Sequence, residues 1–417
     1  MKYPITPAYL ANIPNGLVDL YTWLEDYIIK QICEQLNATG EVNATAIELI
    51  RQLQRRGLDM SAIEREIRRA TGLSDSELDN IFNDAVNRNN AYYDAAYDKL
   101  GLFQEDAQIE QLSAEVEAIR AQTHDIMRNI TQSMGFGMRG LDGSIIISNA
   151  QETYQRILDR ATLKVMTGTE SYNAAIRDGV REMANSGLIG DWVEYRDEEG
   201  QVYHRNRVDV AVRRTVMTGV TQVSSKYTEA AAEDFETPYR EVSAHRGARD
   251  KGIGWQDHKS WQGKVYSVNS GDKYPSIYAV CGWGQVDGLE GANCRHMHFP
   301  FIEGFSERTY TDKELKNIDT PPFKFEGRQY TAYEATQKQR QIERALRAVK
   351  RRLTAFKAVG DNEAYTADAV RYRRLNEEYR AFSEAAGLPE QKERANIEGF
   401  GPNESRAALR AAANANT

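Results

Sequence analysis

The sequence predicts a mainly α, elongated protein of several helical segments, with a small central α+β, loop-rich module and a C-terminal helical hairpin. Apolar residues recur every three or four positions over residues 17–36, 106–133 and 208–235, which is typical of one face of an amphipathic helix. Between His245 and His298 this period stops, and the segment holds four of the six histidines, two of the three cysteines and three of the five tryptophans. The two patterns together predict a helical frame that carries one distinct module.

Residues 1–134 are predicted to form an N-terminal helical domain. Its first helix covers residues 17–36, and shorter helices follow. Ser74 and Glu77 fit a capping box, in which the serine and glutamate side chains satisfy backbone N–H groups at the start of a new helix. A long helix over residues 106–133 completes this part of the chain.

The segment 135–206 is predicted to hold a hinge, a helix and a β-hairpin. Four glycines fall between Gly135 and Gly143, which indicates a domain boundary or hinge. Between Trp192 and Arg205, apolar and polar residues alternate on both sides of a glycine-containing turn, which is typical of a β-hairpin.

The region 207–310 is predicted to be one module, in which a long helix precedes the Cys/His-rich loops. Thiolate sulfur and imidazole nitrogen are the ligands that zinc prefers in proteins. We therefore expect a tetrahedral zinc site with four ligands, which are His258, Cys281, Cys294 and His296. His245 and His298 are reserve ligands. The Cys-x12-Cys-x-His spacing is not that of a zinc knuckle, so sequence alone leaves the ligand set open.

Two alternatives to a metal site remain open for the same loops. In the first, the module packs around its tryptophans, with a buried Trp261 indole, histidines that bond to backbone carbonyls, and cysteines that are buried or form a disulfide. In the second, Asp257 and His258 act as the base and Cys294 as the nucleophile of a hydrolase. No nucleophile elbow, phosphate loop or His-Glu-x-x-His helix supports the second alternative.

Residues 311–398 are predicted to form the C-terminal helical hairpin. The first helix, residues 333–359, has an apolar seam with alternating spacings of four and three, which comprises Ile342, Leu346, Val349, Leu353 and Phe356. Gly360 to Asn362 turn the chain before a second helix. Residues 399–417 are predicted to be a flexible tail.

The first helix of this hairpin is strongly basic. Between Gln337 and Lys357, eight lysines or arginines stand against Glu343 alone. Such a surface can neutralise the phosphates of double-stranded DNA or bind an acidic protein surface. The residues that we expect to make this contact are Arg344, Arg347, Arg351 and Arg352. The alternative is a solvated charged face with no partner.

Composition limits the function classes further. The 417 residues include 53 basic and 61 acidic ones, a net charge of −8, so any contact with DNA must be local. The hydrophobic share of 41% and the charged share of 27% exclude a wholly disordered chain. Three cysteines are too few for a secreted disulfide framework. No apolar run suggests a signal peptide or a membrane span, so we expect synthesis in the cytoplasm and no membrane contact.

Five sequence runs resemble the phage minor capsid protein 2 family. They occur in the family's order as VDVAVRRTVMTGVTQVSSKY, SAHRGARD, DHKSWQGKVYS, CGWGQVDGLEGANCRH and PFIEG, and together they cover residues 208–304. The family is distantly similar to the Mu F-type head morphogenesis proteins. The family pattern falls on His245, Arg249, His258, Trp261, Gln262, Gly263, Cys281, Gly282, Gly284, Gly288, Asn293, Cys294, Arg295 and His296.

The resemblance implies a minor structural protein of a tailed-phage head, made in the cytoplasm of the bacterial host. Its expected partners are the portal, scaffold or capsid proteins, and packaged DNA through the basic helix. No catalytic activity comes with the family, so no catalytic residue and no certain cofactor are expected. The function from another class is a metal- or thiol-dependent hydrolase, or a toxin-like enzyme, carried in the virion.

Overall fold

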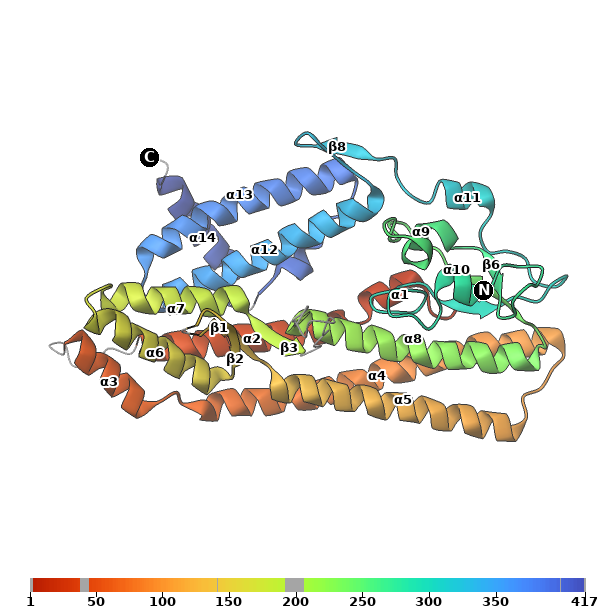
Figure 1. Ribbon diagram of the computed structural model, residues 1–417, viewed down its shortest axis with the longest axis horizontal. Coiled ribbons are helices and arrows are strands. Elements are labelled where there is room, and N and C mark those ends of the chain that lie inside the picture. Colours follow the sequence, from red (N-terminus) through yellow and green to blue (C-terminus); the bar gives the residue numbers. More distant parts are fainter. Residues whose placement is uncertain (1–2, 38–44, 141, 192–205, 398, 416–417) are drawn as a thin grey trace. The chain divides into compact units, whose positions relative to one another are not determined.

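A computed structural model describes residues 3–37, 45–140, 142–191, 206–397 and 399–415 (Figure 1). Its longer helices are α2 (Asn15–Leu36), α3 (Ala46–Arg56), α4 (Met60–Leu100), α5 (Asp106–Ser133), α6 (Ala150–Met166), α7 (Tyr172–Ser186), α8 (Val208–Asp234), α12 (Ala332–Ala358), α13 (Asn362–Ala386) and α14 (Pro402–Asn414). The short ones include α1 (Pro7–Asn12), α9 (His258–Trp261), α10 (Ile277–Cys281) and α11 (Asp312–Lys316). The prediction of a mainly α protein with a small α+β part is confirmed, and the hairpin expected at 192–205 lies outside the described residues.

Among the residues that the structure describes, the strands form three small antiparallel sheets. The first has the order β2-β1-β3-β4, with β1 (Gly135–Arg139), β2 (Ile145–Ser148), β3 (Leu188–Asp191) and β4 (Asn206–Arg207). The second has the order β6-β5-β7, with β5 (Tyr239–Val242), β6 (Val265–Ser267) and β7 (His298–Pro300). The third is the hairpin of β8 (Phe323–Phe325) and β9 (Arg328–Tyr330).

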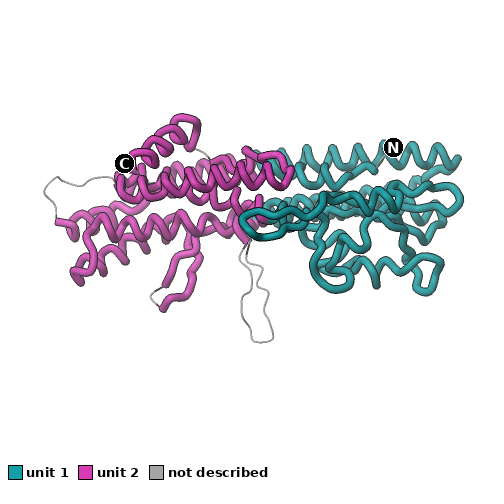
Figure 2. The backbone as a smooth tube through the Cα atoms, turned by 90° about the horizontal axis from the view of Figure 1, so that it is seen from above, with its two compact units in different colours: residues 1–17, 73–128, 212–337 teal, residues 18–72, 129–211, 338–417 magenta. Residues whose placement is uncertain are grey.

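The chain divides into two compact units, each built from three separate stretches (Figure 2). Unit 1 comprises residues 1–17, 73–128 and 212–337, and unit 2 comprises residues 18–72, 129–211 and 338–417. The sequence predicts five consecutive domains, whose boundaries differ from those of the two units. This division stays a prediction, with domains at 1–134, 135–206, 207–310, 311–398 and 399–417.

The long helices of unit 1 pack through valines and through polar pairs. On α8, Val216, Val220 and Val223 are fully buried, as the spacing predicts. The Ser224 hydroxyl donates to Asn89 Oδ1 on α4 at 3.0 Å. Because the partners of these polar groups are side chains of another helix, the contact fixes the register of α8 on α4.

The glycine-rich segment after α5, where a domain boundary or hinge is expected, begins with a strand. Gly135 to Arg139 form β1, which pairs with both β2 and β3. A Cβ atom on Gly135 would lie 2.7 Å from the Ser148 carbonyl oxygen. The glycine therefore permits close approach of two backbones.

The capping box expected at Ser74 and Glu77 is wrong, because α4 runs through both residues without a break. The Ser74 side chain is 2% exposed and caps no helix. Gly72, just before it, keeps ordinary helical backbone and does not adopt a positive φ. A capping signal is a weak local preference, and packing of a long helix outweighs it.

The helical hairpin is confirmed in unit 2. All five seam residues of α12 are buried, at 0 to 3% exposure. Side-chain bonds join Gln339 to Ser383, Glu343 to Tyr379, and Arg352 to Asp368. Partner numbers fall on α13 as they rise on α12, so the two helices are antiparallel.

The tail expected to be flexible contains a helix, α14, which packs on α13. Ala408 and Ala412 are fully buried at a spacing of four, and Ser405 bonds to the Tyr372 hydroxyl at 2.9 Å. Pro402 stands in the first turn, where its missing N–H costs nothing. The alanines that suggested disorder instead allow two helices to approach closely.

A network of buried charges joins the three stretches of unit 2. It comprises Glu25, Asp26, Arg207, Asp209, Arg347 and Arg351. The Arg351 guanidinium lies 3.0 Å from a Glu25 oxygen and 3.2 Å from an Asp26 oxygen. Arg207 binds the other Glu25 oxygen at 2.8 Å. Three cations face three anions, so the network is neutral.

Asp209 carries the second half of this network. Its carboxylate accepts from Arg347 at 2.5 Å, and Arg207 lies 3.5 Å away. The neighbouring arginines hold the pKa of Asp209 below its usual range, although burial acts in the opposite direction as the largest single effect. Both partners are almost completely buried, so the pair is inaccessible to a ligand in solution.

These contacts correct the expectation for the basic helix. Arg347 and Arg351 point into unit 2, and Arg352 binds Asp368 at 2.6 Å. Among the four arginines expected to meet DNA or an acidic protein, Arg344 is the exposed one. The sequence gives the number of charges, but it could not show that Arg347 and Arg351 bind acids 138 and 325 residues away in the chain.

We expect Arg351→Met to lower the free energy of unfolding by about 3–5 kcal/mol, because it leaves buried carboxylates without a partner. Arg344→Met, on the exposed face of the same helix, is the control and should change it by less than about 0.5 kcal/mol. Urea unfolding followed by circular dichroism measures both. Equal midpoints for the two variants would contradict a stabilising role of the network.

A second prediction concerns Lys350, whose ammonium donates to the Ala395 carbonyl at 2.5 Å. Burial lowers the pKa of Lys350 from 10.5 to about 8. Between these two values the unfolded chain binds more protons than the folded chain, so the contribution of Lys350 to stability rises with pH. Lys350→Met should lack this rise. Unfolding midpoints of parent and variant from pH 7 to pH 10 measure it, and parallel curves would contradict the prediction.

Candidate functional site

The loop-rich module of unit 1 is built around the second sheet. A buried cluster beneath its loops comprises Val242, Trp261, Tyr266, Ile277, Cys281, Leu289 and Cys294. Strand β5 pairs with β6 and β7, so the segments before and after the long loops are tied to one central strand. With so little regular structure, the loops depend on side-chain contacts for their conformation.

Three of the four expected metal ligands lie together. Ligand atoms of His258, Cys294 and His296 are all within 4.8 Å of one another, and all three side chains are buried. Cys294 Sγ is 3.7 Å from His258 Nδ1 and 3.5 Å from His296 Nδ1. His258 begins α9, and the other two residues precede β7, so the sheet brings distant parts of the loops together.

The outer nitrogen of each imidazole has its own acceptor. His258 Nε2 lies 2.9 Å from the Asp287 backbone carbonyl oxygen. His296 Nε2 lies 3.1 Å from Gln262 Oε1, which also accepts the His245 backbone N–H at 3.0 Å. Since both atoms are acceptors, each imidazole carries its proton on Nε2 and turns an unprotonated Nδ1 toward Cys294.

Burial keeps this group uncharged in the absence of a metal. It lowers the pKa of His258 to about 4, and the pKa of His296 lies well below its usual value through burial and the neighbouring histidines. Burial also raises the pKa of the Cys294 thiol to about 11. A protonated, buried thiol is a poor nucleophile, and His258 directs its nitrogens to Asp287 and Cys294, so the geometry gives no support to an Asp257–His258 base.

Cys281 does not join the three residues, which corrects the four-ligand expectation. It ends α10 and packs in the apolar cluster, fully buried. Burial raises the pKa of its thiol. The nearby Tyr266 hydroxyl donates to the Trp261 carbonyl at 2.7 Å. All three cysteines of the chain are free thiols, so the disulfide alternative is also wrong.

The Trp261 ring packs against both histidines of the site. Its ring centroid lies 4.6 Å from that of His258 and 4.9 Å from that of His296. The indole is 1% exposed, and its N–H donates to the Trp255 carbonyl at 2.8 Å. The expectation of a buried indole with a hydrogen-bond partner is confirmed, and the tryptophan positions both imidazoles.

Other residues of the sequence signature lie around Trp261 and the two histidines. His245 stacks on His296 at a centroid distance of 4.4 Å, and Arg295 contacts the His245 ring. Arg249 donates to the same Asp287 carbonyl that accepts from His258. Gly263 and Asn293 both have positive φ, at 70° and 59°, conformations that glycine and asparagine tolerate best. The signature thus describes one folded site.

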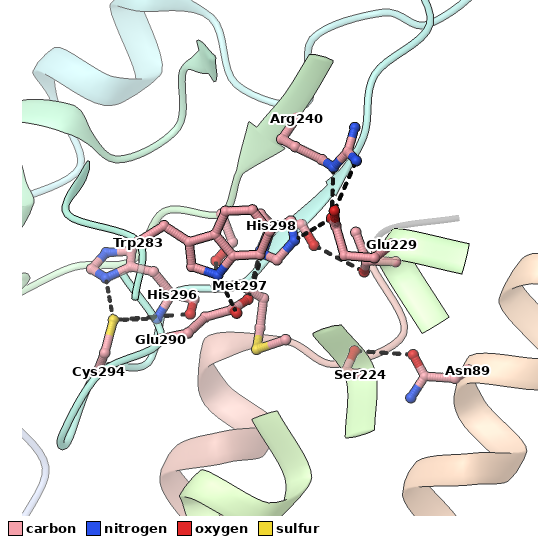
Figure 3. A network of polar contacts seen from close by, with 12 residues as sticks. Asn89, Ser224, Glu229, Arg240, Trp283, Glu290, Cys294, His296, Met297 and His298 are labelled. Atoms are coloured by element: carbon pink, nitrogen blue, oxygen red, sulfur yellow. Dashed lines mark hydrogen bonds and ion pairs between the residues drawn. The ribbon is translucent and has the colours of Figure 1, made fainter. Parts of the chain in front are cut away.

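His298, a reserve ligand, has a different role. Its two ring nitrogens contact Glu290 at 2.7 Å and Glu229 at 2.9 Å, and Arg240 binds the Glu229 carboxylate from the other side (Figure 3). Burial alone would lower the pKa of His298, but the two carboxylates raise it to about 9. Sequence reasoning missed Glu229, Glu290 and Arg240, since no local pattern links them to a histidine.

Comparison with known proteins finds sequence relatives of this chain. A protein of Lactococcus phage LL-H named "Structural protein" is 27% identical over 222 residues, which are 51% of this chain and 52% of that protein. The match thus spans about half the length of that relative. No solved structure matches the chain.

These findings define a structural protein of a phage. The sequence profile of the family described as phage minor capsid protein 2 matches residues 5–384, nearly the whole chain. The chain belongs to this family. Within the described residues, no helix combines the length and the apolar character that crossing a membrane requires.

We expect Trp261→Ala to lower the free energy of unfolding by about 3–5 kcal/mol, because it removes a fully buried aromatic side chain. Phe103→Ala, in the same unit but 92% exposed, is the control and should stay within about 0.5 kcal/mol of the parent. Urea unfolding followed by circular dichroism compares them. A parent-like Trp261→Ala variant would show that the indole does not support the site.

Proposed function

We propose that the protein is a minor component of the phage head that acts in head assembly through contacts with portal, scaffold or capsid proteins. The observation that carries this proposal is the family match over residues 5–384, which includes stretches of both units. A structural role needs a rigid scaffold and exposed contact surfaces. The buried ion pairs of unit 2 and the sheet of unit 1 supply the first.

Exposed apolar side chains in the loop-rich module support a protein partner. Ile253, Tyr278 and Val286 are exposed, and the Trp255 ring is partly so. Large apolar side chains gathered on one module are typical of protein contact sites. Contacts with other head proteins therefore suit this module better than contacts with a charged polymer.

Contact with packaged DNA is a separate and finer proposal. The net charge of −8 opposes general attraction to DNA, and three of the four arginines expected to meet phosphates bind carboxylates within unit 2. Arg344 is left as the exposed member of that set. A DNA contact would thus depend on few charges, and its affinity would respond only weakly to salt.

Mass spectrometry of purified virions and procapsids tests the proposed role. We expect the protein in both particles at a fixed number of copies relative to the major capsid protein, because a structural component is incorporated stoichiometrically. As a control, a non-structural phage protein should be lost on purification. Absence from both particles would contradict the proposal.

The hydrolase alternative has its own measurement. Peptide and ester hydrolysis by the purified protein should be no faster than by Cys294→Ala, because the Cys294 thiol is buried and protonated. A turnover that this substitution abolishes would favour an enzyme.

A further inference from the structure

We propose that His258, Cys294 and His296 bind one zinc ion, through Nδ1 of each imidazole and Sγ of the cysteine. The inference does not depend on the role in head assembly, because it rests on the hydrogen bonds and distances of the site alone. It differs from the expectation from sequence in its ligand set, which has three residues and leaves out Cys281.

Counting protons shows that the site is incomplete without a further partner. Both Nε2 atoms donate to fixed acceptors, so both Nδ1 atoms present a lone pair to one sulfur. A thiol has one hydrogen, and it can serve one of the two imidazoles, or the His296 carbonyl oxygen at 3.9 Å. At least one buried nitrogen then lacks a partner, which costs free energy. A cation among the three atoms satisfies both lone pairs at once.

The distances fit a zinc ion. With bonds of about 2.3 Å to sulfur and about 2.0 Å to nitrogen at the tetrahedral angle, sulfur and nitrogen stand about 3.5 Å apart. The observed separations of 3.5 and 3.7 Å agree with this value. Both sulfur–nitrogen pairs therefore already have the separation that coordination of the ion requires.

The surroundings have the form that metal-binding histidines require. A ligating imidazole donates its other N–H to a carbonyl or carboxylate oxygen, which fixes its tautomer and its orientation. His258 uses the Asp287 carbonyl and His296 uses Gln262 in this way. The His296 backbone N–H points to Cys294 Sγ at 3.4 Å, which favours negative charge on the sulfur.

The choice of zinc follows from the donor set. One thiolate and two imidazoles are soft and borderline ligands, which select zinc over magnesium or calcium. Among the described histidine, cysteine and acidic residues, no fourth ligand atom joins the group. The protein ligands of the proposed site are therefore these three side chains.

The metal would cross-link two parts of the loop-rich module. His258 starts α9, whereas Cys294 and His296 lie 36 or more residues later, before β7. The loops between them contain little regular structure, so a metal bond at their base orders them. Binding energy at such a site contributes directly to folding stability.

Metal analysis of the full chain, purified without a histidine tag, tests this proposal. We expect about one zinc per chain by elemental analysis, and loss of most of it in His258→Gln and Cys294→Ser. The matched control is Cys281→Ser, which alters a second buried cysteine of the same apolar cluster. This control should keep its zinc. Chelation of the parent should lower its melting temperature by several degrees and expose the loops to protease.

Cobalt substitution gives an independent readout if Cys294→Ser fails to fold. The parent loaded with Co²⁺ should show a tetrahedral visible spectrum and a thiolate charge-transfer band, and X-ray absorption should find one sulfur ligand. A folded, zinc-free parent that gains no metal from zinc-containing buffer would overturn the proposal. Two sulfur ligands, or zinc loss in Cys281→Ser equal to that in Cys294→Ser, would overturn the three-residue set.

Discussion

Unit 2 depends on the buried ion pairs that Arg351 forms with Glu25 and Asp26. An arginine at 2% exposure is stable only where anions and hydrogen-bond acceptors replace water, and Glu25 and Asp26 supply them. This pairing fixes α12 against α2, and through Arg207 and Asp209 it also fixes the start of α8. These ion pairs set the orientation of α12, and the rest of the helical hairpin and α14 pack onward from it.

The same constraint, that buried polar groups need partners, shapes the module of unit 1 by other means. In that module, backbone carbonyls and neutral side chains are the main hydrogen-bond acceptors for the buried polar groups. Gln262 Oε1 accepts from both His296 and the His245 backbone, and the Asp287 carbonyl accepts from both His258 and Arg249. His298, with Glu290 and Glu229, is a charged contact in the same module.

Periodicity predicted the elements that have one apolar face. Residues 17–36, 106–133 and 208–235 correspond closely to α2, α5 and α8, and the seam of α12 is buried throughout. Apolar spacing reports local geometry, so it could not tell that α4 continues through Ser74. Nor could it show that Arg351 of α12 meets Asp26, 325 residues earlier in the chain.

The composition of the sequence predicted where the candidate site lies, but it did not predict which residues belong to the site. A segment rich in cysteine and histidine indicated where chemistry would lie, and three of its four expected ligands converge. From the sequence, Cys281 and Cys294 are equally good candidates for a metal ligand. Only the folded path of the chain after α10 shows that Cys294 joins the histidines and Cys281 does not. The acceptor that fixes the His258 tautomer is a backbone carbonyl, which every residue has, so no residue type could have revealed it.

The long span of these contacts bears on how the chain is made. Asp26 leaves the ribosome 325 residues before Arg351, which at roughly 5–20 residues per second is a delay on the order of tens of seconds. Unit 1 has a similar dependence, because Tyr3 donates to Glu241, 238 residues later. Neither unit can close while its N-terminal stretch alone has been translated. During that interval Asp26 lacks its Arg351 partner, so this buried ion pair can form only after most of the chain has been translated.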